Sequence, residues 1–140
     1  MSDLEQYAKE HQVPIMMDDG LSFLLEKLQE NQCLSFLELG TAIARTSIEV
    51  AKLDPRMRVV TIERNSEMIV QAKKNIEESG LSAQIILIEG DALEVNVDGM
   101  FDCIFIDAAK AQYQRFFEKY CMHLNENGII VSDNMNFHGL

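Results

Sequence analysis

Short apolar runs alternate with amphipathic segments along this chain. The apolar runs predict strands buried on both faces, at residues 36–39, 58–62, 84–88, 101–106 and 129–131. Apolar residues three or four positions apart predict helices between them, at about residues 20–30, 42–53, 66–80 and 110–124, and a charged helix is expected at 2–12. Since strands that alternate with helices form parallel sheets with right-handed crossovers, the pattern predicts an α/β fold with five parallel strands flanked by helices.

Local side chains indicate where some of these elements begin and how they pack. Ser66 is expected to cap the helix at 66–80. A turn at Asn127 and Gly128 is expected to lead into the last strand. The helix at 110–124 is expected to pack against the sheet through Phe116, Phe117 and Tyr120.

The segment at residues 36–46 is the most informative part of the pattern. It predicts a buried strand, a tight turn at Gly40 and a helix that opens at about Ala42. Glu63 ends the next strand, and an acid about 20 residues after such a turn commonly binds ribose hydroxyls. Ala42 stands where a dinucleotide fingerprint has glycine, which argues against NAD. The motif instead resembles the first motif of class I S-adenosylmethionine (SAM) methyltransferases, although an ordinary buried strand with a glycine turn also fits.

Acidic and amide side chains follow several of the predicted strands. Asp107, Asp133 and Asn134 would meet at the carboxyl edge of a parallel sheet and offer hard oxygen ligands that suit Mg²⁺. Lys110 lies three residues after Asp107, where a nearby metal would lower its pKa and let it act as a base. The alternatives are a helix cap at Asp107, a plain turn at 133–134 and a surface lysine.

Composition narrows the class of protein. The 140 residues predict one domain, and the net charge of −11 argues against strong non-specific binding of nucleic acid. Cys33, Cys103 and Cys121 are scattered, as expected for packing residues in a reducing cytoplasm. No signal peptide and no apolar run long enough for a membrane span is seen, so we expect a cytoplasmic protein that does not enter the membrane.

Several motifs together carry a family resemblance. Residues 105–113 (FIDAAKAQY), 131–134 (VSDN), 7–16 (YAKEHQVPIM), 61–65 (TIERN) and 90–93 (GDAL) resemble the metal-dependent O-methyltransferases related to catechol O-methyltransferase. Within that group, the motifs are most similar to those of bacterial tRNA 5-hydroxyuridine methyltransferases. The resemblance covers nearly the whole chain and implies a Rossmann-like methyltransferase domain.

The resemblance also implies roles for individual residues. Lys110 would be the catalytic base, with Asp107 beside it, and Mg²⁺ would be held by Asp107, Asp133 and Asn134. SAM would lie against Met16, Glu38, Gly40, Thr41, Thr46, Glu63, Asp91, Ala92 and Asp107. Of these, Met16 and Thr46 would contact its methionine part, Glu63 its ribose, and Asp91 and Ala92 its adenine. The methyl acceptor would be 5-hydroxyuridine in tRNA or, alternatively, a small catechol-like phenol. A catalytically silent module that binds SAM or dimerises is the non-enzyme alternative.

Three features depart from the family pattern. Ala44 stands where the family usually has glycine, and Arg45 where it usually has an aromatic residue. The sequence also lacks the last two strands of the family's sheet, so the strand at 129–131 is expected to form an exposed edge. An exposed edge favours association with another chain, and we expect a homodimer.

Overall fold

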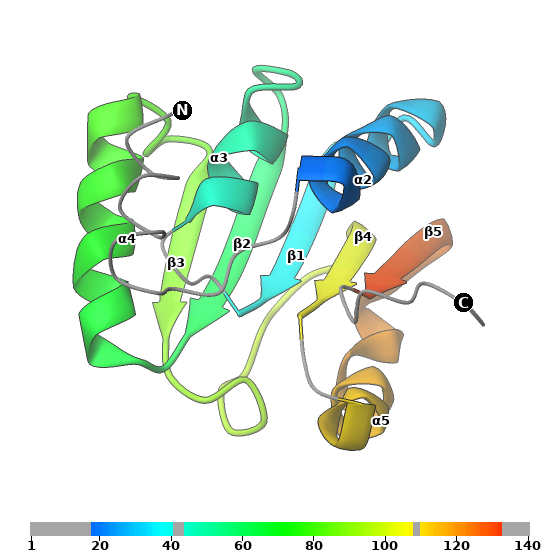
Figure 1. Ribbon diagram of the computed structural model, residues 1–140. Helices are drawn as coiled ribbons and strands as arrows, with labels where there is room; N and C mark the ends of the chain where they lie inside the picture. Colours follow the sequence, from blue (N-terminus) through cyan, green and yellow to red (C-terminus); the bar gives the residue numbers. More distant parts are fainter. Residues whose placement is uncertain (1–17, 41–43, 108–109, 133–140) are drawn as a thin grey trace.

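The computed structural model describes residues 18–40, 44–107 and 110–132. In this part of the chain the core is one parallel sheet with the strand order β3-β2-β1-β4-β5 (Figure 1). The strands are β1 (Ser35–Leu39), β2 (Arg58–Glu63), β3 (Ile85–Glu89), β4 (Phe101–Ile106) and β5 (Leu124–Ser132). This arrangement confirms the predicted fold class, and β5 lies at one edge of the sheet as expected.

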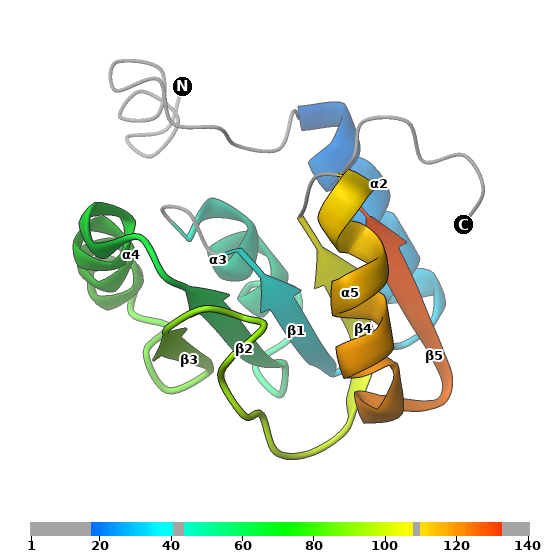
Figure 2. The ribbon, with the colours of Figure 1, turned by 90° about the horizontal axis from the view of Figure 1, so that it is seen from below.

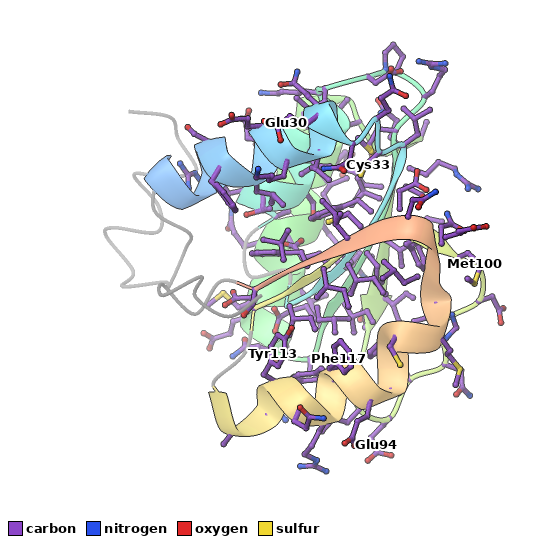
Figure 3. All side chains as sticks on the ribbon, turned by 90° about the vertical axis from the view of Figure 1, so that its right-hand side faces the viewer. Glu30, Cys33, Glu94, Met100, Tyr113 and Phe117 are labelled. Carbon is purple, nitrogen blue, oxygen red and sulfur yellow. The ribbon has the colours of Figure 1, made fainter. Side chains whose placement is uncertain are left out.

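The helices cover both faces of this sheet. Figure 3 shows α2 (Asp18–Glu30) on one side of β5 and α5 (Lys110–Tyr120) on the other. Buried apolar residues of α3 (Arg45–Ala51) and α4 (Ser66–Ser79), among them Ile48 and Ile76, belong to the same hydrophobic core as the leucines of α2. None of the helices in the described ranges is long and apolar enough to cross a membrane.

Alternate strand residues contribute to two separate cores. Phe36 and Phe105, whose rings stack 6.2 Å apart, lie in the core beneath α2, α3 and α4. Leu37 and Ile104 lie in the second core, which contains Phe116 and Tyr120 of α5. Because successive side chains of a strand point to opposite faces, both faces need apolar residues. This double burial explains the continuous apolar runs in the sequence.

Two predicted helix starts need correction. The helix expected to open at about Ala42 begins at Arg45, after Ala44 in the left-handed conformation (φ 73°). Helix α4 is capped by Asn65 rather than by Ser66, because the Asn65 side chain accepts the N–H groups of Glu67 and Met68. Both serine and asparagine are good caps, so the sequence alone did not distinguish two adjacent candidates.

The end of α5 and the start of β5 also differ from the prediction. The helix ends at Tyr120 and a single 3₁₀ turn, Cys121–His123, leads directly into β5 at Leu124. Asn127, with φ 67°, lies inside this longer strand, where the pairing with β4 shifts register. The turn signal at 127–128 therefore marks an irregularity within the strand. The side chain of Asn125 donates to Asp102 and holds this part of β5 against β4.

Two burial predictions were wrong. Phe116 and Tyr120 are buried as expected, but Phe117 is 36% exposed. Cys33 and Cys103 are packing residues, whereas Cys121 is exposed. The helix predicted at 2–12 lies outside the described residues.

The conformation of Ala44 leads to a paired stability prediction. Ala44→Gly and Ala51→Gly each remove one buried methyl group and each make the unfolded chain more flexible. Only Ala44 has a positive φ, which disfavours alanine but suits glycine. We therefore expect Ala51→Gly to cost about 1–2 kcal/mol more unfolding free energy than Ala44→Gly. Urea denaturation of both variants measures the difference, and equal losses would contradict it.

Candidate functional site

A pocket of about 440 Å³ lies at the carboxyl end of the sheet. It is formed by the ends of β1, β2 and β4, by the loop after β3 and by α5. Its lining includes five residues predicted from the sequence: Gly40, Glu63, Asp91, Ala92 and Asp107. Its size is in the range typical of small-molecule sites.

The floor of this pocket is an extension of the sheet's hydrogen-bond ladder. The N–H of Gly40 donates to the Ile62 carbonyl (2.9 Å) and the N–H of Asp107 to the Leu39 carbonyl (3.2 Å). The N–H of Gly90 donates to the Glu63 carbonyl (2.9 Å). The residues that follow three strands are therefore fixed relative to one another.

Two glycines keep this floor open. Gly40 has φ 105°, and a Cβ there would lie 3.4 Å from the Asp107 carbonyl oxygen. Gly90 has φ 152°, and a Cβ there would lie 2.5 Å from the Val95 side chain. Both conformations favour glycine. A side chain at position 40 would contact Asp107 at the pocket lining, to which both residues belong.

Glu63 is held in position at the end of β2. Its Oε2 atom accepts the backbone N–H groups of Arg64 (3.1 Å) and Asn65 (3.0 Å). Arg64 then reaches across to Asp91, with 3.4 Å between Nη1 and Oδ2. A carboxylate fixed in this way at the end of the second strand is suited to accept hydrogen bonds from ribose hydroxyls.

Glu38 is a buried carboxyl group that does not line the pocket. It is 2% exposed, and its Oε1 atom accepts hydrogen bonds from the hydroxyls of Ser47 (2.5 Å) and Thr61 (2.8 Å). Burial raises the pKa of Glu38 from 4.5 to about 8; these two hydrogen bonds oppose the increase, and Asp107 and Glu63 add to it. The group connects β1 to β2 and α3, and its predicted contact with a cofactor stays a prediction.

Of the other predicted site residues, the structure describes only some. Thr46 is buried in the first turn of α3 and does not line the pocket, and Lys110 is the first residue of α5. Outside the described residues lie Met16, Thr41, Asp133 and Asn134.

The predicted metal site likewise extends beyond what the structure describes. Among residues 18–40, 44–107 and 110–132, no group of three His, Cys, Asp or Glu side chains could hold a metal ion. One predicted ligand, Asp107, is exposed directly after β4. Ile106 pairs with Ser132, so β4 and β5 end side by side, immediately before residues 107 and 133. This register fits a shared oxygen-ligand site, and Mg²⁺ stays a prediction.

Sequence reasoning missed part of the pocket lining. Arg64 follows Glu63 directly, and Gln112 and Arg115 reach the pocket from α5. Phe116 was expected only in the core, but it also lines the pocket. The helical spacing of 112, 115 and 116 indicates one face of α5, but nothing local in the sequence says that this face borders a pocket.

Comparisons with known proteins agree with this geometry. A family model described as O-methyltransferase matches residues 1–140. A catechol O-methyltransferase of Niastella koreensis is 34% identical over 121 residues, which are 81% of this chain and 54% of that protein. The chain thus spans about half the length of this curated relative.

Solved structures are similar over most of the chain. A Staphylococcus aureus protein assigned as a caffeoyl-CoA O-methyltransferase has a TM-score of 0.90 and 39% identity, over 99% of this chain and 69% of that one. A Bacillus cereus O-methyltransferase in complex with SAH has a TM-score of 0.83 and 28% identity, over 94% and 64% of the two chains.

The raised pKa of Glu38 predicts a pH dependence of stability. The unfolded chain releases this proton near pH 4.5, whereas the folded chain retains it to about pH 8. The chain therefore takes up a proton on folding at pH values between 4.5 and about 8, and the free energy of unfolding falls as the pH rises through this window. Glu38→Gln should remove this part of the decline, on the order of a few kcal/mol, since one pKa unit corresponds to about 1.4 kcal/mol.

Urea denaturation at several pH values from 4.5 to 8.5 measures this effect. Glu89→Gln is the control, because Glu89 is an exposed carboxyl group at the end of β3, and its replacement should leave the pH slope unchanged. If the free energy of unfolding of Glu38→Gln declined with pH as steeply as that of the parent chain, the raised pKa of Glu38 would be contradicted.

Proposed function

We propose that the pocket binds SAM and that the protein transfers its methyl group to a hydroxyl oxygen, because this chain belongs to the O-methyltransferase family. The observation that carries the proposal is the meeting of Gly40, Glu63 and Ala92 in one pocket. These residues come from three separate segments, and all three were predicted to bind SAM, Glu63 at its ribose and Ala92 at its adenine.

The pocket suits each part of an adenosine group. Ile62, Leu93 and Phe116 provide apolar surface for a flat ring. Glu63 is placed to accept hydrogen bonds from the ribose. The sulfonium would lie near Gly40 and Asp107, which contact each other at the pocket lining. The carboxylates of Glu63 and Asp107 favour a positive charge there.

The proposed chemistry depends on the carboxyl ends of β4 and β5. Asp107, Asp133 and Asn134 would hold Mg²⁺, which when bound would stabilise the ionised form of an acceptor hydroxyl. Lys110, three residues after Asp107, would accept the proton from that hydroxyl at Nζ. The fixed turn residues would hold the donor in line with the acceptor, so that positioning supplies much of the rate.

A small catechol-like phenol is the acceptor that the relatives favour. The curated protein described above is a catechol O-methyltransferase, and a net charge of −11 opposes association with a polyanion. 5-Hydroxyuridine in tRNA is the second candidate and is supported by motif resemblance alone. A cytoplasmic location and a homodimer complete the proposal, with β5, which lies at one edge of the sheet among the described residues, as the candidate contact.

Calorimetric titration of SAM tests the cofactor site. We expect micromolar binding by the parent chain and, for Glu63→Ala, a Kd weaker by about 10-fold or more, since a charged hydrogen-bond acceptor is lost. Glu89→Ala is the matched control: Glu89 pairs with Glu63 in the sheet but does not line the pocket. Absence of SAM binding, or an equal effect of both substitutions, would refute the site.

Methyl transfer from SAM to catechol tests whether the reaction requires Mg²⁺. We expect turnover with Mg²⁺, its loss after chelation by EDTA, and an unchanged affinity for SAM. Asp107→Asn should reduce turnover strongly, whereas Asp98→Asn, in an exposed part of the loop, should not. tRNA that contains 5-hydroxyuridine serves as the competing acceptor. If neither acceptor is methylated although SAM binds, the silent-module alternative is correct.

A further inference from the structure

The connection between β3 and β4 contributes both to the core and to the pocket. Over residues 90–100 it is an extended loop, whereas helices lie between the other consecutive strands (Figure 2). Ala92 and Val97 are buried in the core beneath α5, while residues 91–94 line the pocket. The position of this loop therefore determines the shape of one pocket wall.

Residues 91–95, here called the pocket loop, form three hydrogen bonds among themselves. The N–H groups of Glu94 and Val95 donate to the Asp91 carbonyl (2.8 and 2.9 Å). The N–H of Leu93 donates to the Asp91 carboxylate (2.9 Å). The carbonyls of Ala92 and Val95 accept none of these three bonds, and backbone carbonyls inside a protein need partners.

The last turn of α5 supplies these partners. Lys119 Nζ donates to the carbonyls of Ala92 (2.8 Å) and Val95 (2.5 Å), and the Tyr120 hydroxyl donates to the Ala92 carbonyl (2.5 Å). Tyr120 is 1% exposed, and Lys119 Nζ lies 5.2 Å from the centre of its ring. Burial raises the pKa of Tyr120 to about 12, so the hydroxyl keeps the proton that it donates.

The same helix also forms the facing part of the pocket. Gln112, Arg115 and Phe116 line it from α5. Figure 3 shows Glu94, at the end of the pocket-lining segment, beside α5 on the side away from β5. The three hydrogen bonds from Lys119 and Tyr120 thus fix the distance between two walls of one pocket.

We propose that Lys119 and Tyr120 are positioning residues of the cofactor site, which hold the pocket loop against α5 in the shape that receives the adenine ring. This inference rests on the proposed function, since it assumes that the pocket binds SAM. Neither residue lines the pocket itself. Their loss should weaken binding at the adenine end and leave the methionine end unaffected.

Calorimetry with S-adenosylhomocysteine and S-inosylhomocysteine tests the proposal, because the two ligands differ only in the base. Lys119→Met removes the donor group and keeps most of the stem, while Lys119→Arg restores donors. We expect Lys119→Met to weaken S-adenosylhomocysteine binding by about 10-fold, as for loss of a charged hydrogen bond, and to weaken S-inosylhomocysteine binding less. Lys119→Arg should recover most of the loss.

Two further variants separate positioning from a general loss of stability. Tyr120→Phe removes one hydrogen bond with little change in packing and should show the same loss of base discrimination to a smaller degree. Lys73→Met is the control, because Lys73 is exposed and pairs with Glu89 away from the pocket. Thermal denaturation identifies any variant that fails to fold.

The outcomes distinguish the two proposals. If the parent chain binds neither ligand, the proposed function fails and this inference fails with it. If the parent chain binds both while Lys119→Met and Tyr120→Phe keep the same affinities and base discrimination, only the inference is overturned. A lower melting temperature with unchanged ligand affinities would give both residues a purely structural role.

Discussion

The common register of four parallel strands at their carboxyl ends is the constraint on which the pocket depends. The ladder extends beyond β1, β3 and β4 through the N–H groups of Gly40, Gly90 and Asp107, so these residues leave the sheet at fixed positions relative to one another. A shift of one residue in any strand would exchange its core-facing side chains and break this alignment. The hydrogen bonds that pair the strands therefore also hold together the residues that line the pocket.

Acidic side chains at this edge affect one another. Glu38, Glu63 and Asp107 lie close enough that the last two raise the pKa of Glu38, which burial has already raised. The carboxylates of Glu63 and Asp107 line the pocket, where they disfavour an added anion and favour a cation; both a sulfonium and Mg²⁺ are cations. The hydroxyls of Ser47 and Thr61 reduce the cost of burying Glu38 and join the first two strands to α3. The charges that line the pocket therefore also affect the protonation of a carboxyl group buried in the core.

The elements were predicted well where burial dominates and less well where local signals compete. The strand at 101–106 was predicted with its observed bounds, since a strand covered on both faces is mostly apolar, and Asp102 is its one charged residue. Ser66 and Asn65 are adjacent candidates for one cap, and only the observed geometry distinguishes them. The turn signal at Asn127 proved to mark an irregular strand, because pairing with β4 outweighed the local preference.

The order of apolar and polar residues by itself determined the α/β fold and the group of side chains at the carboxyl edge, because parallel strands necessarily bring these ends together. Tertiary structure decided which of these side chains face the pocket: Glu63 does so, whereas Glu38 turns into the core. It also decided that Lys119 and Tyr120 hold the pocket loop. The physical reason is that contacts between residues more than 20 positions apart depend on how helices and loops pack on the sheet, and this packing leaves no periodic or local signature in the chain.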